Sequence, residues 1–92
     1  MRFEWDERKN ALNVSRHKID FADVPLVFNG PMVVGYDDRE DYGEDRWIGI
    51  GLLRNTVIVV VFIERERDTV RIISARKANR YECQRYAEAI KD

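Results

Sequence analysis

A run of seven consecutive apolar residues, from Val57 to Ile63, constrains the fold of this chain more than any other part of its sequence. Six of the seven side chains are β-branched, and such side chains favour strands because a helix restricts their χ1 rotamers. A strand with one face in water alternates apolar and polar residues, and this run contains no polar residue. We therefore expect a central strand buried on both faces. The run is also far shorter than a membrane-spanning helix, which needs about 20 residues, so we expect no membrane segment.

Other segments have the alternating pattern of half-buried strands. In residues 46–53, large apolar side chains alternate with Gly49 and Gly51, which would then occupy the opposite face. Residues 54–56 and 64–68 are polar and read as turns on either side of the central run. The expected strands are residues 32–36, 46–53, 57–63 and 70–74, and residues 1–4 could form a further short strand at the start of the chain.

Two helices are expected before most of these strands. Asp6 is a suitable N-cap for a helix that ends at His17. The spacing of Lys9, Asn13 and Arg16 places them on one face of this helix, beside His17.

The second helix is expected to follow a cap at Asp20. Phe21, Val24 and Phe28 have the spacing of an apolar helix face. Pro25 lies within this segment and would remove a backbone hydrogen bond, so either the helix begins near Val24 or its first turn is irregular.

A third helix is expected from Arg76 to Lys91. The order of two helices, three or four adjacent strands and one helix predicts an α+β fold with a small antiparallel sheet. At 92 residues the chain is expected to form one domain, residues 1–92. The apolar stripe of the third helix consists of Cys83, Tyr86, Ala87 and Ile90.

Composition and charge indicate a folded, charged domain without an internal disulfide. Apolar residues are 45% of the chain and charged residues 36%, which is typical of a folded domain with a charged surface rather than a disordered chain. The single cysteine excludes an internal disulfide, and with the acidic N-terminus it favours the cytoplasm. The net charge is −4 over residues 1–46 and +3 over residues 47–92. This asymmetry indicates either a site for a polyanion or ordinary solvated charge.

The residue types favour some chemistries over others. With one histidine and one cysteine the chain lacks the ligand pattern of a metal cage, and it has no glycine-rich phosphate loop, so we expect neither metal nor cofactor. Cleavage of RNA without a metal needs proton-transfer groups and cations that stabilise the charge on phosphorus. The residues of suitable type are His17, Glu64, Arg65, Arg76, Arg80 and Tyr86.

The order of short motifs resembles the BrnT family of bacterial toxins. Residues 3–6, Phe-Glu-Trp-Asp, open the pattern, and residues 71–76, Arg-Ile-Ile-Ser-Ala-Arg, form its most specific later part. The remaining positions of the pattern are Lys9, Asn13, Arg16, His17, Phe21, residues 27–28, 44–46, 48–49 and 64–65, Lys77, Ala78, Arg80 and Tyr86.

The resemblance implies a RelE-like fold and a toxin of a type II toxin–antitoxin system. Such a toxin is an endoribonuclease that arrests growth, and a BrnA-like antitoxin neutralises it and carries the DNA-binding part. The resemblance implies RNA as substrate and contact with DNA only through the antitoxin. The residues that we expect to carry the chemistry are His17, Arg65, Arg76 and Arg80, with Lys9, Arg16 and Lys77 binding RNA phosphates.

Two positions depart from the family pattern. Lys18 stands where the family has a glycine that ends the helix in a left-handed turn, so a different ending is expected here. Pro25 interrupts a helix that the family keeps regular. These departures favour an alternative: an inactive module of the same fold that binds an antitoxin-like partner or RNA. For Arg76 and Arg80 a structural role is also open, either in ion pairs with Glu82 or in an antitoxin interface.

Overall fold

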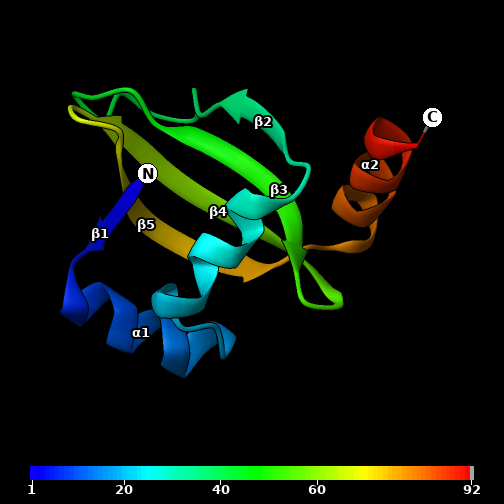
Figure 1. The fold of residues 1–92 in the computed structure, drawn as a ribbon, viewed down its shortest axis with the longest axis horizontal. Helices are drawn as coiled ribbons and strands as arrows, with labels where there is room; N and C mark the ends of the chain where they lie inside the picture. Colours follow the sequence, from blue (N-terminus) through cyan, green and yellow to red (C-terminus); the bar gives the residue numbers. More distant parts are fainter. Residues whose placement is uncertain (92) are drawn as a thin grey trace.

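A five-stranded mixed sheet forms the centre of the computed structural model, which describes residues 1–91 (Figure 1). The central strand, β4, contains the whole apolar run, and its residues 58–63 are buried, so the expectation of a strand covered on both faces is confirmed. The sheet order is β1-β5-β4-β3-β2. The strands are β1 (Arg2–Trp5), β2 (Val33–Tyr36), β3 (Trp47–Leu53), β4 (Thr56–Arg65) and β5 (Thr69–Lys77).

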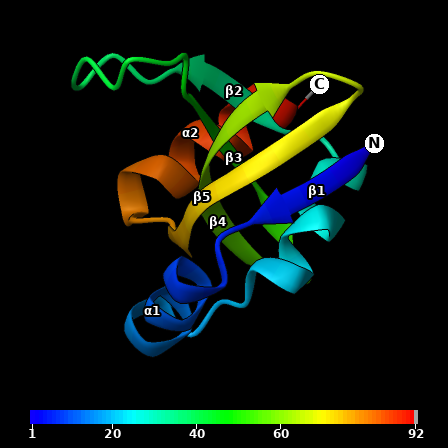
Figure 2. The same ribbon diagram turned by 90° about the vertical axis from the view of Figure 1, so that its left-hand side faces the viewer.

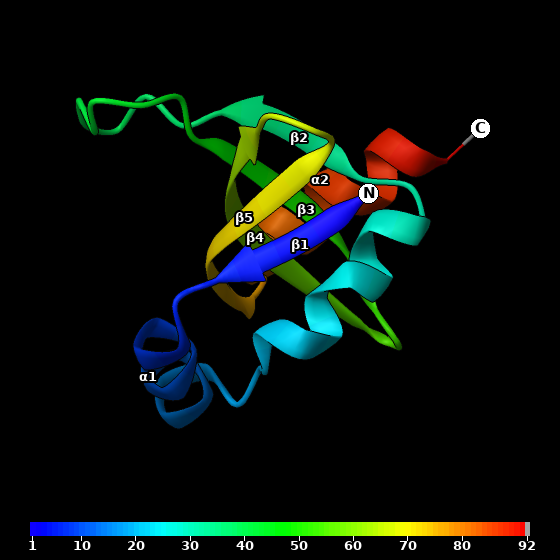
Figure 3. The ribbon, with the colours of Figure 1, turned by 60° about the vertical axis from the view of Figure 1, so that its left-hand side comes forward.

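The expected α+β class is confirmed, but the sheet has five strands instead of three or four and is mixed instead of antiparallel. β2 to β5 do form an antiparallel meander, but β1 adds a fifth strand that runs parallel to β5 (Figures 2 and 3). β1 joins because Phe3 and Trp5 pack against the core while Arg2 pairs with Thr69 in register. This pairing joins segments more than 60 residues apart, and no local pattern encodes it.

Helix α1 (Glu7–His17) begins where the sequence predicted. The Asp6 carboxylate accepts hydrogen bonds from the backbone N–H groups of Arg8 and Lys9, as an N-cap does. The expectation of a different ending at Lys18 is wrong. Lys18 itself adopts the left-handed conformation, with φ 60° and ψ 30°, and its N–H donates to the Val14 carbonyl. The lysine thus takes the backbone shape that glycine usually supplies.

The second helix, η1 (Phe21–Asn29), is a 3₁₀ helix along its whole length. Neither expected arrangement around Pro25 is right, because the entire segment has about three residues per turn. With that period Phe21, Val24 and Val27 share one face, and all three are buried. The buried face therefore includes Val27 in place of Phe28, which an α-helical spacing had predicted. Phe28 is only half-buried.

The two faces of the sheet have different covers, as Figure 3 shows. The η1 face, formed on β4 by Ile58, Val60 and Phe62, packs against η1 in the main hydrophobic cluster. The α2 face, which includes Val59 and the β3 residue Ile50, packs against helix α2 (Arg80–Ile90) through Tyr86.

Gly49 and Gly51 lie on the η1 face, opposite Ile50, as the alternation predicted. A Cβ on Gly49 would lie 2.5 Å from the Met32 Cε atom, and one on Gly51 would lie 2.6 Å from the Val27 Cγ1 atom. The absence of side chains at these two positions therefore lets η1 and the segment after it lie directly on β3.

Asn13 attaches α1 to the part of β5 that lies beyond its pairing with β1. Its side-chain oxygen accepts a hydrogen bond from the Ala75 N–H at 3.1 Å, and its amide nitrogen donates to the Ile19 carbonyl at 2.9 Å. Asn13 is buried, whereas its neighbour Leu12 is 56% exposed. The helix packs through polar residues because the neighbouring strand edge offers unpaired backbone groups.

The boundary between β5 and α2 lies later than predicted. The ladder with β4 continues to Lys77, so Arg76 and Lys77 belong to a strand and not to a helix. The helix starts at Arg80 because Asn79 and Glu82 form a capping box. In the expected stripe of α2, Tyr86 is buried, but Ala87 and Ile90 are exposed. None of the helices within residues 1–91 is long and apolar enough to cross a membrane.

Candidate functional site

A cavity of about 290 Å³ lies on the α2 face, between the sheet and the first turns of α2. Its floor is apolar and comes from β3 and β4, while its rim carries three arginines from three separate parts of the chain. A concave site with an apolar floor and a few convergent polar groups is the usual form of a ligand site. The residues that line it are Arg39, Ile48, Ile50, Val59, Val61, Ser74, Arg76, Tyr81, Glu82 and Arg85.

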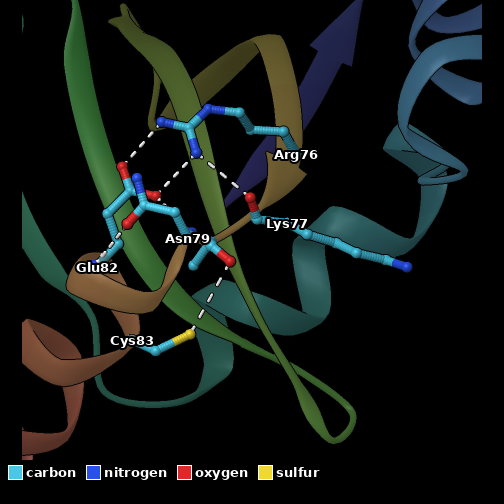
Figure 4. A network of polar contacts seen from close by, with 6 residues as sticks. Arg76, Lys77, Asn79, Glu82 and Cys83 are labelled. Carbon is cyan, nitrogen blue, oxygen red and sulfur yellow. Dashed lines mark hydrogen bonds and ion pairs between the residues drawn. The ribbon is translucent and has the colours of Figure 1, made fainter.

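Arg76 is held in place by Glu82 (Figure 4). Its Nη1 and Nη2 atoms donate to the two carboxylate oxygens of Glu82, each at 2.8 Å, which is a bidentate pair. Nη1 also donates to the Lys77 carbonyl at 3.3 Å. The side chain of Arg76 is 41% exposed, so its remaining N–H groups can reach a ligand in the cavity.

Glu82 is positioned by the helix cap as well as by Arg76. One carboxylate oxygen accepts from the Asn79 backbone N–H at 2.8 Å, and the Asn79 side chain accepts from the Glu82 N–H. The hydrogen bonds from Arg76, and then the one from Asn79, lower the pKa of Glu82 to about 2. Glu82 is therefore ionised at neutral pH and raises the pKa of Arg76 in turn.

Arg39 is fixed by a second bidentate pair. Its Nε and Nη2 atoms donate to the Asp37 carboxylate at 2.7 and 2.8 Å. Asp37 is only 1% exposed, and the hydrogen bonds from Arg39 lower its pKa, so it is a buried anion that orients the guanidinium above it. The positive charge of Arg39 lies close enough to Arg76 to repel it, and this repulsion lowers the pKa of Arg76 slightly against the larger effect of Glu82.

Arg85 is the third arginine of the rim, and it is the least constrained. Its guanidinium carbon lies 5.9 Å from the ring centre of Tyr81, within reach of a weak cation–π contact. Over residues 1–91 it makes no ion pair within 4.0 Å. Two of the three arginines are thus paired with a carboxylate, Arg76 with Glu82 and Arg39 with Asp37. Arg85 gives the rim an excess of positive charge.

This arrangement suits a phosphate group. Arginine forks pair with phosphate oxygens in a fixed geometry, and prior fixation by Glu82 and Asp37 reduces the entropy that binding costs. The part of the chain that the structure describes contains no group of three histidine, cysteine or acidic residues able to hold a metal ion. Apart from the arginines, the groups lining the cavity that could give or accept a proton are the Ser74 and Tyr81 hydroxyls and the Glu82 carboxylate.

The structure places the predicted site residues in several different regions. Arg76 lies in the cavity, and Arg80 is exposed at the start of α2 without lining it. Lys77 points away from Arg76 and Glu82 (Figure 4), since neighbours in a strand face opposite sides. Arg65 pairs with Thr69 at the far end of β5 and contacts Glu4 at 3.4 Å.

The residues expected on α1 do not line the cavity either. Lys9 and Arg16 are exposed, and His17 is half-buried in the last turn of the helix. Tyr86 is 3% exposed, and its hydroxyl donates to the Pro31 carbonyl at 3.0 Å, which is a structural contact rather than a reactive one.

Arg39 and Arg85 are cavity residues that the sequence reasoning missed. Arg39 is the only cation in the acidic stretch 37–45, and its spacing from Asp37 is that of a local side-chain pair. Arg85 belongs to the basic stretch 69–85, but its place beside Arg76 depends on how α2 folds back over the sheet.

Comparison with known proteins agrees with the resemblance seen in the sequence. A family model described as "Ribonuclease toxin, BrnT, of type II toxin-antitoxin system" matches residues 5–82. The crystal structure of the Brucella abortus ribonuclease toxin BrnT is similar, with a TM-score of 0.68 and 28% sequence identity. The match covers 87% of this chain and 99% of the Brucella chain. No curated protein sequence matches.

Proposed function

This chain belongs to the BrnT family of ribonuclease toxins of type II toxin–antitoxin systems, and we propose that it is itself a metal-independent endoribonuclease that arrests growth. The observation that carries the proposal is the cavity rimmed by Arg39, Arg76 and Arg85. Three guanidinium groups around one hollow, two of them fixed by carboxylates, form a site for the phosphodiester of RNA.

In the proposed reaction the ribose 2′-oxygen attacks phosphorus, and the bond from phosphorus to the 5′-oxygen of the next nucleotide breaks. The 2′-hydroxyl gives up a proton, and the leaving 5′-oxygen receives one. Negative charge increases on the phosphate oxygens in the transition state, where Arg76 and Arg39 stabilise it.

Glu82 is a candidate for the first proton transfer. In the free protein it is a weak base, since the hydrogen bonds from Arg76 are the main cause of its low pKa. A phosphate bound by the remaining N–H groups of Arg76 shares that guanidinium with Glu82 and weakens the bonds between the two side chains, which makes the carboxylate more basic. His17, Arg65 and Arg80 remain proposed catalytic residues on the family resemblance, with Lys9, Arg16 and Lys77 as proposed RNA contacts.

The proposed partner is a BrnA-like antitoxin that neutralises the toxin by binding it. Contact with DNA would then occur only through the antitoxin, and the proposed site of action is the cytoplasm, where the RNA substrate is. A second candidate function is an inactive module that binds RNA or the antitoxin, and one observation favours it: none of the residues that line the cavity is a histidine.

The test is growth under tightly controlled expression in a bacterium, followed by cleavage of RNA with the purified protein. We expect arrest by the wild type, and we expect Arg76→Ala and Arg39→Ala each to lower the cleavage rate by about 10²-fold, as loss of a charge-stabilising donor does. Arg54→Ala, which removes a surface arginine outside the cavity, is the matched control.

The cleavage rates of His17→Ala and Arg80→Ala, measured in the same assay, show whether catalysis depends on the cavity or on the residues proposed from the family resemblance. Folded wild-type protein that neither arrests growth nor cuts RNA would contradict the ribonuclease proposal and favour the inactive module. Full activity in both Arg39→Ala and Arg76→Ala would remove the cavity from the mechanism.

A further inference from the structure

A second hollow, of about 270 Å³, opens directly beside the arginine cavity on the α2 face. The two hollows share Ile48, Ile50 and Arg85, so a ligand can extend from one into the other without leaving the surface. The second hollow is nevertheless different in chemistry, because Arg85 is its only charged residue. Its lining consists of Val33, Val34, Gly35, Tyr36, Ile48, Ile50 and Arg85.

The floor of this hollow has no side chain at Gly35. Gly35 pairs with Ile48 in the ladder between β2 and β3, and a Cβ on Gly35 would meet no atom within 4 Å. The floor therefore has aliphatic side chains around an open patch of backbone. Arg85, which is exposed on α2, supplies a planar cation at the boundary with the arginine cavity.

The strand β2, which contributes Gly35 to the floor, also adds hydrogen-bonding groups at the rim of the hollow. β2 is an edge strand of the sheet, since its neighbour on one side is β3 and the order ends with β2. Alternate backbone N–H and C=O groups of an edge strand have no partner in the ladder and face outward. An apolar floor with open space at Gly35, a guanidinium plane and free backbone groups at the rim are together suited to a planar, polar-edged aromatic ring.

We infer that this hollow binds the nucleobase next to the phosphate held by Arg39, Arg76 and Arg85, and that the substrate is single-stranded RNA. The inference rests on the proposed function, because the phosphate in the arginine cavity determines which base lies beside it. A base must be unstacked to enter such a hollow, which single-stranded RNA permits and a duplex does not. Arginine planes stack well on bases.

The experiment measures the affinity of the protein for short 2′-O-methyl RNA, which has no free 2′-hydroxyl and is not cut. A matched oligonucleotide with abasic sites reports the phosphate contacts alone. We expect wild-type protein to bind the base-containing strand about tenfold more tightly than the abasic one, a typical gain from stacking one base.

Substitutions of Gly35 place a side chain in the hollow and leave all three arginines unchanged. We expect Gly35→Val to abolish the preference for the base-containing strand and Gly35→Ala to reduce it, while affinity for the abasic strand stays unchanged. Gly30→Val is the control, since a Cβ there also meets no atom within 4 Å and Gly30 lies outside the hollow.

The outcomes separate this inference from the proposed function. Equal affinity of wild type for both strands, or an unchanged preference in folded Gly35→Val and Gly35→Ala, overturns the base site and leaves the phosphate site standing. If neither strand binds, or if binding persists undiminished in Arg76→Ala, the proposed function fails and the base site fails with it.

Discussion

The two faces of the sheet differ in what covers them, although both are built from the same strands. On the η1 face, Phe21, Val24 and Val27 of η1 are at most 1% exposed and lie on β3 and β4. On the α2 face, one short helix covers part of the sheet, and the cavity beside it is rimmed by arginines. One face has the composition of a core, and the other has the composition of a binding site.

The difference teaches how a chain of this size combines stability with a polar site. A strand buried on both faces can rely on one of them for most of its apolar burial. The other face can then hold charged groups, provided that a buried charge has a partner, as Asp37 has in Arg39. Mutations on the η1 face should therefore act on folding, and mutations on the α2 face should act on binding.

The largest expected difference in the free energy of unfolding is between two variants in which one aromatic side chain, on the η1 face or on the α2 face, is truncated to alanine. Phe21 is fully buried, and Phe21→Ala should lower the free energy of unfolding by about 3–5 kcal/mol, because it leaves a cavity in the core. Tyr81 is 65% exposed, and Tyr81→Ala should change the same quantity by less than about 0.5 kcal/mol. Urea denaturation of both variants measures this, and equal losses would contradict the division between the faces.

Addition of one methyl group to a glycine on each face gives a smaller contrast. Gly51→Ala should destabilise the fold by about 1–3 kcal/mol, because the new Cβ would lie 2.6 Å from Val27 and η1 would have to shift. Gly35→Ala should leave stability unchanged or slightly improved, since space is open there. Thermal unfolding of the pair measures the contrast. A Gly51→Ala variant as stable as the wild type would show that η1 does not lie closely on β3.

The smallest expected effect is a dependence on pH that originates on the α2 face. The pKa of Glu82 is lowered from 4.5 to about 2 by folding, so its ionised form stabilises the folded state. That contribution is fully present above about pH 4.5 and is lost as the pH falls toward about 2.

Urea unfolding of wild type and Glu82→Gln across that interval measures it. The wild type should lose more stability on acidification than Glu82→Gln, and Arg76→Ala should resemble Glu82→Gln because it removes the main cause of the low pKa. Parallel pH profiles for all three proteins would show that the pair between Arg76 and Glu82 does not persist in solution.

Local sequence determined the parts of the fold that depend on neighbouring residues. Three features were correctly predicted: the buried strand of residues 57–63, the helix cap at Asp6 and the glycines on the face opposite Ile50. Each depends on residues that are close together in the sequence. The family resemblance, which adds up many short motifs, was also evident from the sequence and agrees with the match over residues 5–82.

Tertiary structure decided the rest. The parallel pairing of β1 with β5 and the 3₁₀ geometry of η1 depend on what these segments pack against. In the site, Arg76 was anticipated as a residue, but its place on a strand and its companions Arg39 and Arg85 were not. Sequence patterns record the local preference of each segment. Which charges meet across a cavity is decided by the packing of α2 and the loop after β2 on one sheet, and this packing joins residues that are far apart in the chain.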